Sequence, residues 1–359
     1  MPATIWRGLS GVDTMNQTVN ITIDGKTIKA PAGATVLEAA LGAGIYIPNL
    51  CYHPDLSASG NCRLCIVQIH GMRGFPTACT TSVVEGMSVN TNGDELTGVR
   101  RNNLQLIIAN HPLDCLSCFK NQRCELQRVA VFMGVKEGKL RSTVSPQVTD
   151  DTNPFFRLKR DYCILCGRCT RTCDEICGVN AIEMLHRGDA THVGVFGDKM
   201  LFESNCHSCG ECVEHCPVGA LAPHEPVVPD VETKTTCCYC ATGCSIYLGV
   251  SDGKIKTVRG NREGQVNHGQ LCVKGRYGIS EFVQHPDRLR TPYIRDKEGL
   301  QPATWDDALS LVARKLATFS ADEVAIVPSA RTTNEDVYVA QKLARAVIGT
   351  NNVDNCARL

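Results

Sequence analysis

The sequence lacks the features that would place the protein in a membrane, outside the cell or on a nucleic acid. No apolar run approaches the roughly 20 residues that span a bilayer, and the opening MPATIWRGLSGVDTM contains neither a signal-peptide core nor a twin-arginine pair. Lys plus Arg and Asp plus Glu both total 37 among 359 residues. This balance gives no reason to expect a nucleic-acid or anionic-membrane surface. We therefore expect a cytoplasmic protein with no membrane span and no nucleic-acid partner.

Common catalytic motifs are absent as well. The sequence has no paired-carboxylate motif, no Ser–His–Asp arrangement, no G-x-G-x-x-G at a strand–helix junction and no Walker loop. It has instead an excess of cysteine, 22 residues, most of them in C-x2-C groups. Cysteines this close together are poor disulfide partners for distant residues but good joint ligands of one metal centre. A long chain without a signal peptide also argues against a disulfide scaffold.

Hydrophobic periodicity predicts elements between these groups. Alternation around Asp24-Gly25 predicts a β-hairpin, followed by a helix over residues 34–44 and another over 96–109. A second hairpin is expected to turn at Asp252-Gly253, after a proline-rich boundary at residues 223–232.

The C-terminal region changes to a helical period. Thr304 is the expected N-cap of a helix with Asp307 at position N3. A buried strand is then expected over residues 323–329, and a helix over 335–348. This order is typical of the opening of a doubly wound α/β domain.

Four cysteines form the first candidate metal site: Cys51, Cys62, Cys65 and Cys79. Four thiolates can hold a [2Fe–2S] cluster, and Gly60 lets backbone amides approach the sulfurs. The first gap is longer than in the plant-type pattern, and a structural zinc ion is an alternative. The hairpin and helix before these cysteines favour the ferredoxin interpretation.

The second site combines a histidine with three cysteines: His111, Cys115, Cys118 and Cys124. Its spacing is compatible with a zinc site of three cysteines and one histidine as well as with a [4Fe–4S] cluster. An imidazole in place of a thiolate removes one negative charge and should raise the reduction potential of a cluster.

A duplicated cysteine run is the strongest signal in the sequence. The pattern C-x2-C-x2-C-x3-C occurs twice within residues 154–225, and proline follows the second copy. In two-cluster bacterial ferredoxins the fourth cysteine of each run ligates the other cluster. We therefore assign two [4Fe–4S] sites, one with Cys163, Cys166, Cys169 and Cys216, the other with Cys206, Cys209, Cys212 and Cys173.

The fifth site joins Cys237, Cys240 and Cys244 to Cys272 across a long gap. Cys238 makes the register ambiguous, and we choose Cys237 because two intervening residues leave the backbone room to turn around a shared metal. Zinc is an alternative here too. The remaining cysteines are expected to be small buried hydrophobes: Cys177, Cys238 and Cys356.

The first four sites, in this order, resemble the electron-input module of the large iron–sulfur subunit of NADH:quinone oxidoreductase. The same module occurs in [FeFe]-hydrogenases and in cytoplasmic NAD(P)-linked formate dehydrogenases. The resemblance covers residues 18 to about 225 and favours a cluster over zinc at His111.

The fifth site and the end of the chain carry a second resemblance. CCYCATGCSIYLGVSDGKIKTVRG and LCVKGRYG are similar to the N-terminal cluster segment of molybdopterin oxidoreductases. In that family the lysine at the position of Lys274 bridges cluster and pterin, although by itself Lys274 would be taken for a solvated side chain. TNEDVYVAQKLARAVIGTNNVDNCARL resembles the formate dehydrogenase α subunit just before its active-site selenocysteine or cysteine, the ligand of molybdenum or tungsten.

These resemblances imply an α+β multidomain iron–sulfur protein. The expected segments are a leader (1–17), a β-grasp [2Fe–2S] ferredoxin domain (18–96), a [4Fe–4S] cluster domain with one histidine and three cysteine ligands (97–136), a linker (137–153), a two-cluster [4Fe–4S] ferredoxin domain (154–225), a molybdopterin oxidoreductase [4Fe–4S] domain (226–288) and the start of an incomplete α/β molybdopterin-binding domain (289–359).

The implied activity is formate oxidation to CO2, or its reverse, at a Mo- or W-bis-molybdopterin guanine dinucleotide held by the complete protein. Electrons would pass through one [2Fe–2S] and four [4Fe–4S] clusters to a flavin- and NAD(P)-binding or ferredoxin-linked partner subunit. The alternative is a non-catalytic electron-relay subunit of a hydrogenase or NADH dehydrogenase complex. A zinc-rich scaffold or nucleic-acid binder is a third interpretation, against which the neutral charge balance counts.

The resemblance at the end of the chain predicts the next codon of the gene. If position 360 is selenocysteine, sequencing beyond Leu359 will find an in-frame UGA, then a histidine codon and a long open reading frame. A UAA or UAG codon without a continuing frame would contradict the formate dehydrogenase hypothesis.

Overall fold

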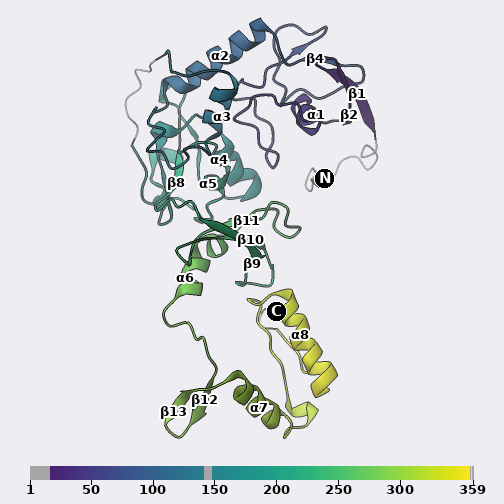
Figure 1. The fold of residues 1–359 in the computed structure, drawn as a ribbon, viewed down its shortest axis with the longest axis vertical. Helices are drawn as coiled ribbons and strands as arrows, with labels where there is room; N and C mark the ends of the chain where they lie inside the picture. The colour runs from purple at the N-terminus through teal and green to yellow at the C-terminus, as the bar shows by residue number, and fades with distance from the viewer. Residues whose placement is uncertain (1–16, 141–147, 356, 358–359) are drawn as a thin grey trace. The chain divides into compact units, whose positions relative to one another are not determined.

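The chain forms two compact units, Met1–Pro226 and Val227–Leu359, in a computed structural model that describes residues 17–140, 148–355 and 357 (Figure 1). The predicted leader, except for residue 17, and the middle of the predicted linker lie outside the described residues. Among the helices that are described, none combines the length and the apolar character that crossing a membrane requires.

A small mixed sheet opens the first unit. The expected hairpin consists of β1 (Thr18–Ile23) and β2 (Lys26–Pro31), and it turns through Asp24 and Gly25, whose φ angles are 49° and 79°. Both turn residues are left-handed, as the tight hairpin requires. The sheet order is β2-β1-β4-β3, in which β4 (Ser88–Asn90) is parallel to β1 and β3 (Gln68–Ile69) is antiparallel to β4.

Helix α1 (Val36–Gly42) covers this sheet. Thr35 and Glu38 form a capping box, since the Glu38 amide donates to Thr35 Oγ1 at 3.2 Å and the Thr35 amide to Glu38 Oε2 at 2.8 Å. Val36 and Leu37 are buried in one cluster with residues of β1. The hairpin, the parallel strand and the crossing helix make the β-grasp arrangement that the sequence predicted.

Two helices follow the sheet. Helix α2 (Asp94–Ala109) includes the predicted helix, and α3 (Glu125–Phe132) begins directly after Cys124. The buried Arg100 of α2 donates to the carbonyls of Thr91 at 2.7 Å and Ile66 at 2.5 Å, which fastens the helix to the β-grasp domain.

The duplicated cysteine run folds as two similar turns. Helices α4 (Arg168–Arg171) and α5 (Glu211–His215) each start after a left-handed glycine, Gly167 and Gly210, at the same place in each run. Strands β5 (Phe156–Leu158) and β8 (Leu221–Pro223) pair at the two ends of this region, and β6 (Glu183–Leu185) pairs with β7 (His192–Gly194) between the runs.

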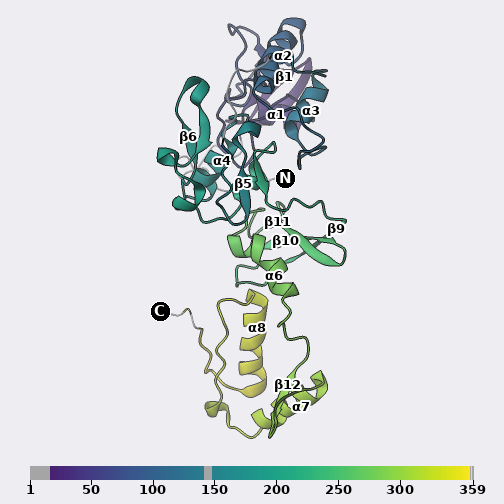
Figure 2. The ribbon, with the colours of Figure 1, turned by 90° about the vertical axis from the view of Figure 1, so that its left-hand side faces the viewer.

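The second unit begins with a three-stranded antiparallel sheet in the order β11-β10-β9 (Figure 2). Strands β10 (Ser245–Ser251) and β11 (Lys254–Gly260) are the predicted hairpin, and its turn residues Asp252 and Gly253 have φ angles of 53° and 69°. Strand β9 (Val231–Thr236), which the sequence analysis did not predict, pairs with β10. Helix α6 (Ile279–Gln284) lies against β11.

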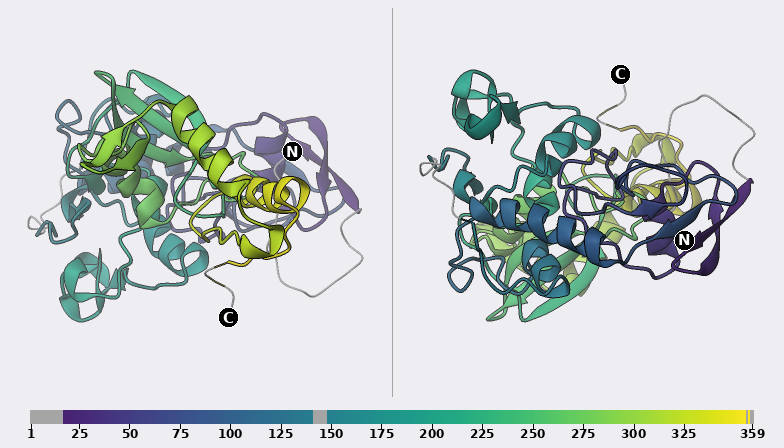
Figure 3. Two further views of the ribbon diagram at one scale, coloured as in Figure 1. Left: turned by 90° about the horizontal axis from the view of Figure 1, so that it is seen from below. Right: turned by 90° about the horizontal axis from the view of Figure 1, so that it is seen from above.

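The last elements are a hairpin of β12 (Tyr293–Asp296) and β13 (Gly299–Pro302), then α7 (Trp305–Leu316) and α8 (Asn334–Lys342) (Figure 3). The described residues also form short 3₁₀ or π-helical turns: Arg160–Tyr162, Thr172–Ile176, Gly188–Ala190, Phe196–Asp198, Leu201–Glu203, Lys274–Gly278, Ala321–Glu323 and Leu343–Ile348.

Two predictions in this region have different outcomes. The predicted cap is confirmed, because Thr304 Oγ1 accepts from the Asp307 amide at 3.2 Å. The predicted buried strand over residues 323–329 is wrong, since only Ile326 forms a bridge, with Val353 in parallel orientation. A parallel strand needs neighbours along its whole length, and here one residue of one neighbour is available.

The packing of α1 generates a prediction. Leu37 is 0% exposed and Leu41, one turn later, is 40% exposed. Leu37→Ala should lower the free energy of opening of the β-grasp domain by about 3 kcal/mol, because it leaves a cavity, whereas Leu41→Ala should cost about 0.5 kcal/mol or less. Hydrogen exchange of the β1 amides measures both. Equal effects of the two substitutions would contradict the packing described.

Candidate functional site

The first four predicted ligands lie in the two loops that flank β3, between α1 and β4. Cys51, Cys62, Cys65 and Cys79 are all buried. The Cys62 amide lies 3.5 Å from Cys51 Sγ, and the Leu50 amide lies 3.4 Å from Cys62 Sγ. Backbone amides directed at sulfur stabilise thiolates that bind a cluster.

Neighbouring thiols change one another's ionisation at this site. Hydrogen bonds from Cys62 and Cys79 hold the pKa of Cys51 far below its ordinary value. Hydrogen bonds of Cys79 with Cys51 and with Cys65 raise the pKa of Cys79. Each such contact brings two sulfurs close together, so the four residues can act as joint ligands of a [2Fe–2S] cluster.

The residues of the second predicted site line a cavity of about 230 Å³. They are His111, Cys115, Cys118 and Cys124. His111 Nδ1 is buried and has no hydrogen-bond partner among the described residues. Burial lowers the pKa of His111 despite the charge of Asp114, which favours the neutral imidazole that binds metals. A buried acceptor beside three thiols fits a centre with three cysteine ligands and one histidine ligand.

Gly219 is a residue of this second site that the sequence analysis missed. A Cβ atom on residue 219 would lie 2.7 Å from Cys118 Sγ, closer than real contacts permit. The backbone after the second cysteine run therefore forms one wall of the His111 cavity. In the sequence the only sign of this role is a glycine two positions after Pro217. The fold is needed to show that this glycine lies beside Cys118.

The duplicated runs exchange their fourth cysteines, as in a two-cluster ferredoxin. Cys163, Cys166 and Cys169 line one small cavity together with Cys216 of the other run. Burial, together with the nearby Cys216, raises the pKa of Cys163 and of Cys166 to about 12. Thiols this crowded resist ionisation until a positively charged metal group compensates them.

The second cavity of this region collects the remaining predicted ligands, Cys173, Cys206, Cys209 and Cys212. It also contains Cys177, whose Sγ lies 3.7 Å from Cys209 Sγ. Cys177 is half-buried, not fully buried as expected, and the turn after α4 places its thiol beside this predicted ligand set. A fifth thiol in this cavity was not predicted.

The fifth predicted site lies in the second unit, between β9 and β10 and before α6. Cys237 is buried and Cys238 is exposed. Burial raises the pKa of Cys237, and the neighbouring Cys238, Cys272 and Cys240 raise it further. The burial of Cys237 and the exposure of Cys238 agree with the chosen register. The exposure of Cys238 also departs from the buried role expected for it.

Three residues near the sulfurs of this fifth site support it: Thr242, Lys274 and Gly275. Hydrogen bonds between Cys240 and Thr242 hold the pKa of Cys240 below its ordinary value, and the positive charge of Lys274 lowers it too. Lys274 is exposed and begins a π-helical turn. A Cβ on Gly275 would lie 3.7 Å from Cys237 Sγ, so the backbone runs close to the sulfurs. Cys356 lies outside the described residues.

No described cysteine forms a disulfide, and each of the five predicted sets remains a candidate metal centre after this geometric test. Bound iron–sulfur clusters would supply one-electron transfer at these sites. The donor sets fit them, with four thiols at four sites and three thiols with a neutral imidazole at the second.

Comparison with known families gives matches along most of the chain. The matching family models are a 2Fe-2S iron-sulfur cluster binding domain (16–94), the NADH-ubiquinone oxidoreductase-G iron-sulfur binding region (100–139), the NADH-quinone oxidoreductase subunit 3 ferredoxin-like domain (153–222), the molybdopterin oxidoreductase Fe4S4 domain (230–284) and molybdopterin oxidoreductase (288–359).

Individual relatives carry several names. A G-type NADH-quinone oxidoreductase subunit of Rhizobium meliloti is 37% identical over 347 residues, and the NADPH-Fe(3+) oxidoreductase subunit alpha of Geobacter sulfurreducens is 36% identical over 350; each match covers 95% of this chain and 40% of the relative. A putative formate dehydrogenase of Staphylococcus aureus is 28% identical over 392 residues, covering 96% of this chain and 39% of the relative. The chain therefore spans about 40% of the length of these curated relatives.

A solved structure, an NAD+-reducing [NiFe]-hydrogenase in the H2-reduced state, has a chain that is 32% identical with a TM-score of 0.54, covering 57% of this chain and 87% of that one. Fold and thiol sites thus define a multidomain iron–sulfur protein of mixed α/β structure with a partial molybdopterin oxidoreductase domain. Over 95% of its length the chain is similar to a G-type NADH-quinone oxidoreductase subunit, and it shares the fold of most of one chain of the NAD+-reducing hydrogenase.

The wall formed by Gly219 generates a prediction. Gly219→Ala should remove one [4Fe–4S] equivalent of iron and sulfide, because the new methyl group occupies the space of Cys118 Sγ. Gly98→Ala is the matched control, since a Cβ on residue 98 of α2 meets nothing within 4 Å. Iron and acid-labile sulfide analysis of the anaerobically purified proteins measures the loss. Full iron content in Gly219→Ala would contradict this description of the cavity.

Proposed function

We propose that this chain is the iron–sulfur relay part of a nicotinamide-nucleotide-linked oxidoreductase complex of the NADH-quinone oxidoreductase or NAD-reducing hydrogenase type. The observation that carries the proposal is the set of separate thiol sites in one compact unit, since four candidate centres lie within Met1–Pro226. A single cluster can only accept and release an electron, whereas several clusters within one compact unit can pass electrons from one to the next.

In this proposal the residues of the chain hold one [2Fe–2S] and four [4Fe–4S] clusters in fixed positions. The thiolates are the ligands, and the buried neutral His111 replaces one thiolate at the second site. Apolar walls exclude water, as at the ferredoxin-like cavity lined by Leu158, Val218 and Leu221. A dry, rigid environment reduces the reorganisation that accompanies each electron transfer.

The relatives favour the relay interpretation over the formate dehydrogenase interpretation. The curated relatives with 36–37% identity are named as NADH-quinone and NADPH-Fe(3+) oxidoreductase subunits. Their names support a partner subunit that binds a nicotinamide nucleotide. The relay subunit, which was the alternative in the sequence analysis, agrees better with these names than the formate dehydrogenase hypothesis does.

Formate oxidation is the second candidate. It is supported by the resemblance of the sequence ending at Leu359 to formate dehydrogenases and by the name of the Staphylococcus aureus relative. In that case the complete protein would hold a Mo- or W-bis-molybdopterin guanine dinucleotide, and Lys274 would connect the fifth cluster to the pterin. The proximity of Lys274 to Cys240 supports that role.

Anaerobic reduction of the complete complex with its natural partner subunits separates these candidates. Under the relay proposal, NADH or NADPH should bleach the visible iron–sulfur absorption. The bleaching by dithionite in the same sample gives the value for full reduction against which this is compared. Bleaching by formate but by neither nucleotide would overturn the relay proposal in favour of formate dehydrogenase. Zinc in place of iron in the purified protein would exclude both.

A further inference from the structure

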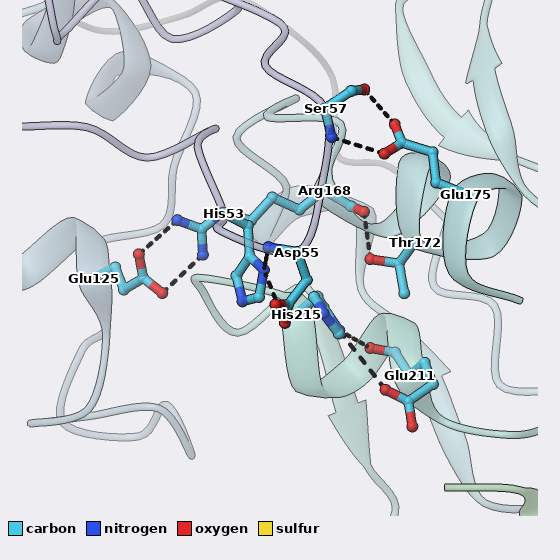
Figure 4. A network of polar contacts seen from close by, with 9 residues as sticks. All are labelled: His53, Asp55, Ser57, Glu125, Arg168, Thr172, Glu175, Glu211 and His215. Atoms are coloured by element: carbon cyan, nitrogen blue, oxygen red, sulfur yellow. Dashed lines mark hydrogen bonds and ion pairs between the residues drawn. The ribbon is translucent and has the colours of Figure 1, made fainter. Parts of the chain in front are cut away.

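A buried arginine lies between candidate cluster sites of the first unit. Arg168 stands between Cys166 and Cys169 on α4 and is 3% exposed. Its Nη1 and Nη2 atoms donate to the two carboxylate oxygens of Glu125, each at 2.8 Å (Figure 4). Glu125 follows Cys124 of the His111 site, so this ion pair joins two cluster-binding segments that are far apart in the sequence.

The next arginine of α4 adds contacts with the β-grasp domain. Arg171 Nη2 donates to the carbonyl of Cys51 at 2.6 Å and to that of Cys166 at 3.5 Å, and its Nη1 donates to the carbonyl of Ser57. Figure 4 shows the segment with His53, Asp55 and Ser57 beside Arg168 and α4. Segments of three candidate sites therefore meet around this one short helix.

The charge of Arg168 acts on more than Glu125. Burial lowers the pKa of its guanidinium, but the hydrogen bonds and charge of Glu125 and the nearby Cys166 and Cys51 thiolates raise it above its ordinary value overall. Arg168 Nε is buried without a hydrogen-bond partner among the described residues. A cation in this low-dielectric position interacts strongly with any change of charge on the neighbouring sulfurs.

We propose that the buried charge of Arg168 raises the reduction potentials of two centres and that Glu125 opposes this effect. The two centres are those held by Cys51, Cys62, Cys65 and Cys79 and by Cys163, Cys166, Cys169 and Cys216. The inference rests on the cluster assignment of the proposed function. Reduction adds one electron from the nucleotide-linked donor to a centre, and no covalent bond forms or breaks. The added negative charge is stabilised by Arg168 and destabilised by Glu125, so the two residues act with opposite signs.

Opposite signs distinguish this role from a purely structural one. Arg168→Gln should lower the midpoint potentials of both centres, and Glu125→Gln should raise them. Arg168→Lys keeps the charge while losing the bidentate geometry, so its potentials should stay near those of the unsubstituted protein. If the ion pair only fastened the segments together, the Arg168 and Glu125 substitutions would have effects of the same sign, or would lower cluster content without shifting potentials.

The test is a redox titration of the complete, cluster-loaded complex, with the [2Fe–2S] and [4Fe–4S] signals followed separately by EPR. Arg259→Gln is the control, because Arg259 forms a solvent-exposed bidentate pair with Glu232 in the second unit, at 2.7 and 2.6 Å. This substitution should leave both potentials unchanged. If Arg168→Gln does not retain its clusters, the other two variants still test the proposal. The midpoint potentials should rise in Glu125→Gln and stay unchanged in Arg168→Lys.

Two outcomes overturn the proposal in distinguishable ways. Unsubstituted protein that carries no iron refutes the cluster assignment, and the role of Arg168 falls with it. Unsubstituted protein with both EPR signals, whose potentials do not move in Arg168→Gln and Glu125→Gln, refutes the role of Arg168 alone and leaves the proposed relay intact.

Discussion

The crowding of thiols is the physical constraint on which this structure depends. At four of the candidate centres, at least one cysteine has its pKa raised mainly by burial, with neighbouring thiolates adding to the effect. Ionising several such groups in a small dry cavity is unfavourable unless a positively charged metal group enters with them. Metal binding and the folding of these loops are therefore expected to be a single coupled process.

The elements around the cavities serve this constraint. Left-handed Gly167 and Gly210 start α4 and α5, which allows each C-x2-C-x2-C run to curl around a cavity. The exchange of the fourth cysteines joins the two runs into one body, and α4 then brings Arg168 and Arg171 to the segments that carry Cys124 and Cys51. Sites that share elements in this way cannot move independently, and fixed separations are what an electron path requires.

Helices α7 and α8 of the second unit depend less on burial than the elements around its β9–β11 sheet. None of the residues of α7 and α8 is buried, and Trp305, Leu309 and Val312 on α7 remain exposed. The capping of both helices by Thr304 and Thr333 is local and forms without a core. A strand, unlike a capped helix, is stabilised by hydrogen bonds with neighbouring strands. The predicted strand before α8 does not form, because Ile326 makes a single bridge.

The sequence by itself determined the hairpins at Asp24-Gly25 and Asp252-Gly253 and the Thr304 cap, and its spacings predict the cysteine sets, because turn residues, capping side chains and ligand spacings act over a few positions along the chain. It did not determine that Cys177 reaches the second ferredoxin cavity, that Gly219 forms a wall of the His111 site, or that Arg168 pairs with Glu125. Each of these contacts joins segments more than 30 residues apart. Only tertiary packing decides such contacts, because no local pattern encodes which distant backbone or charge a side chain will meet.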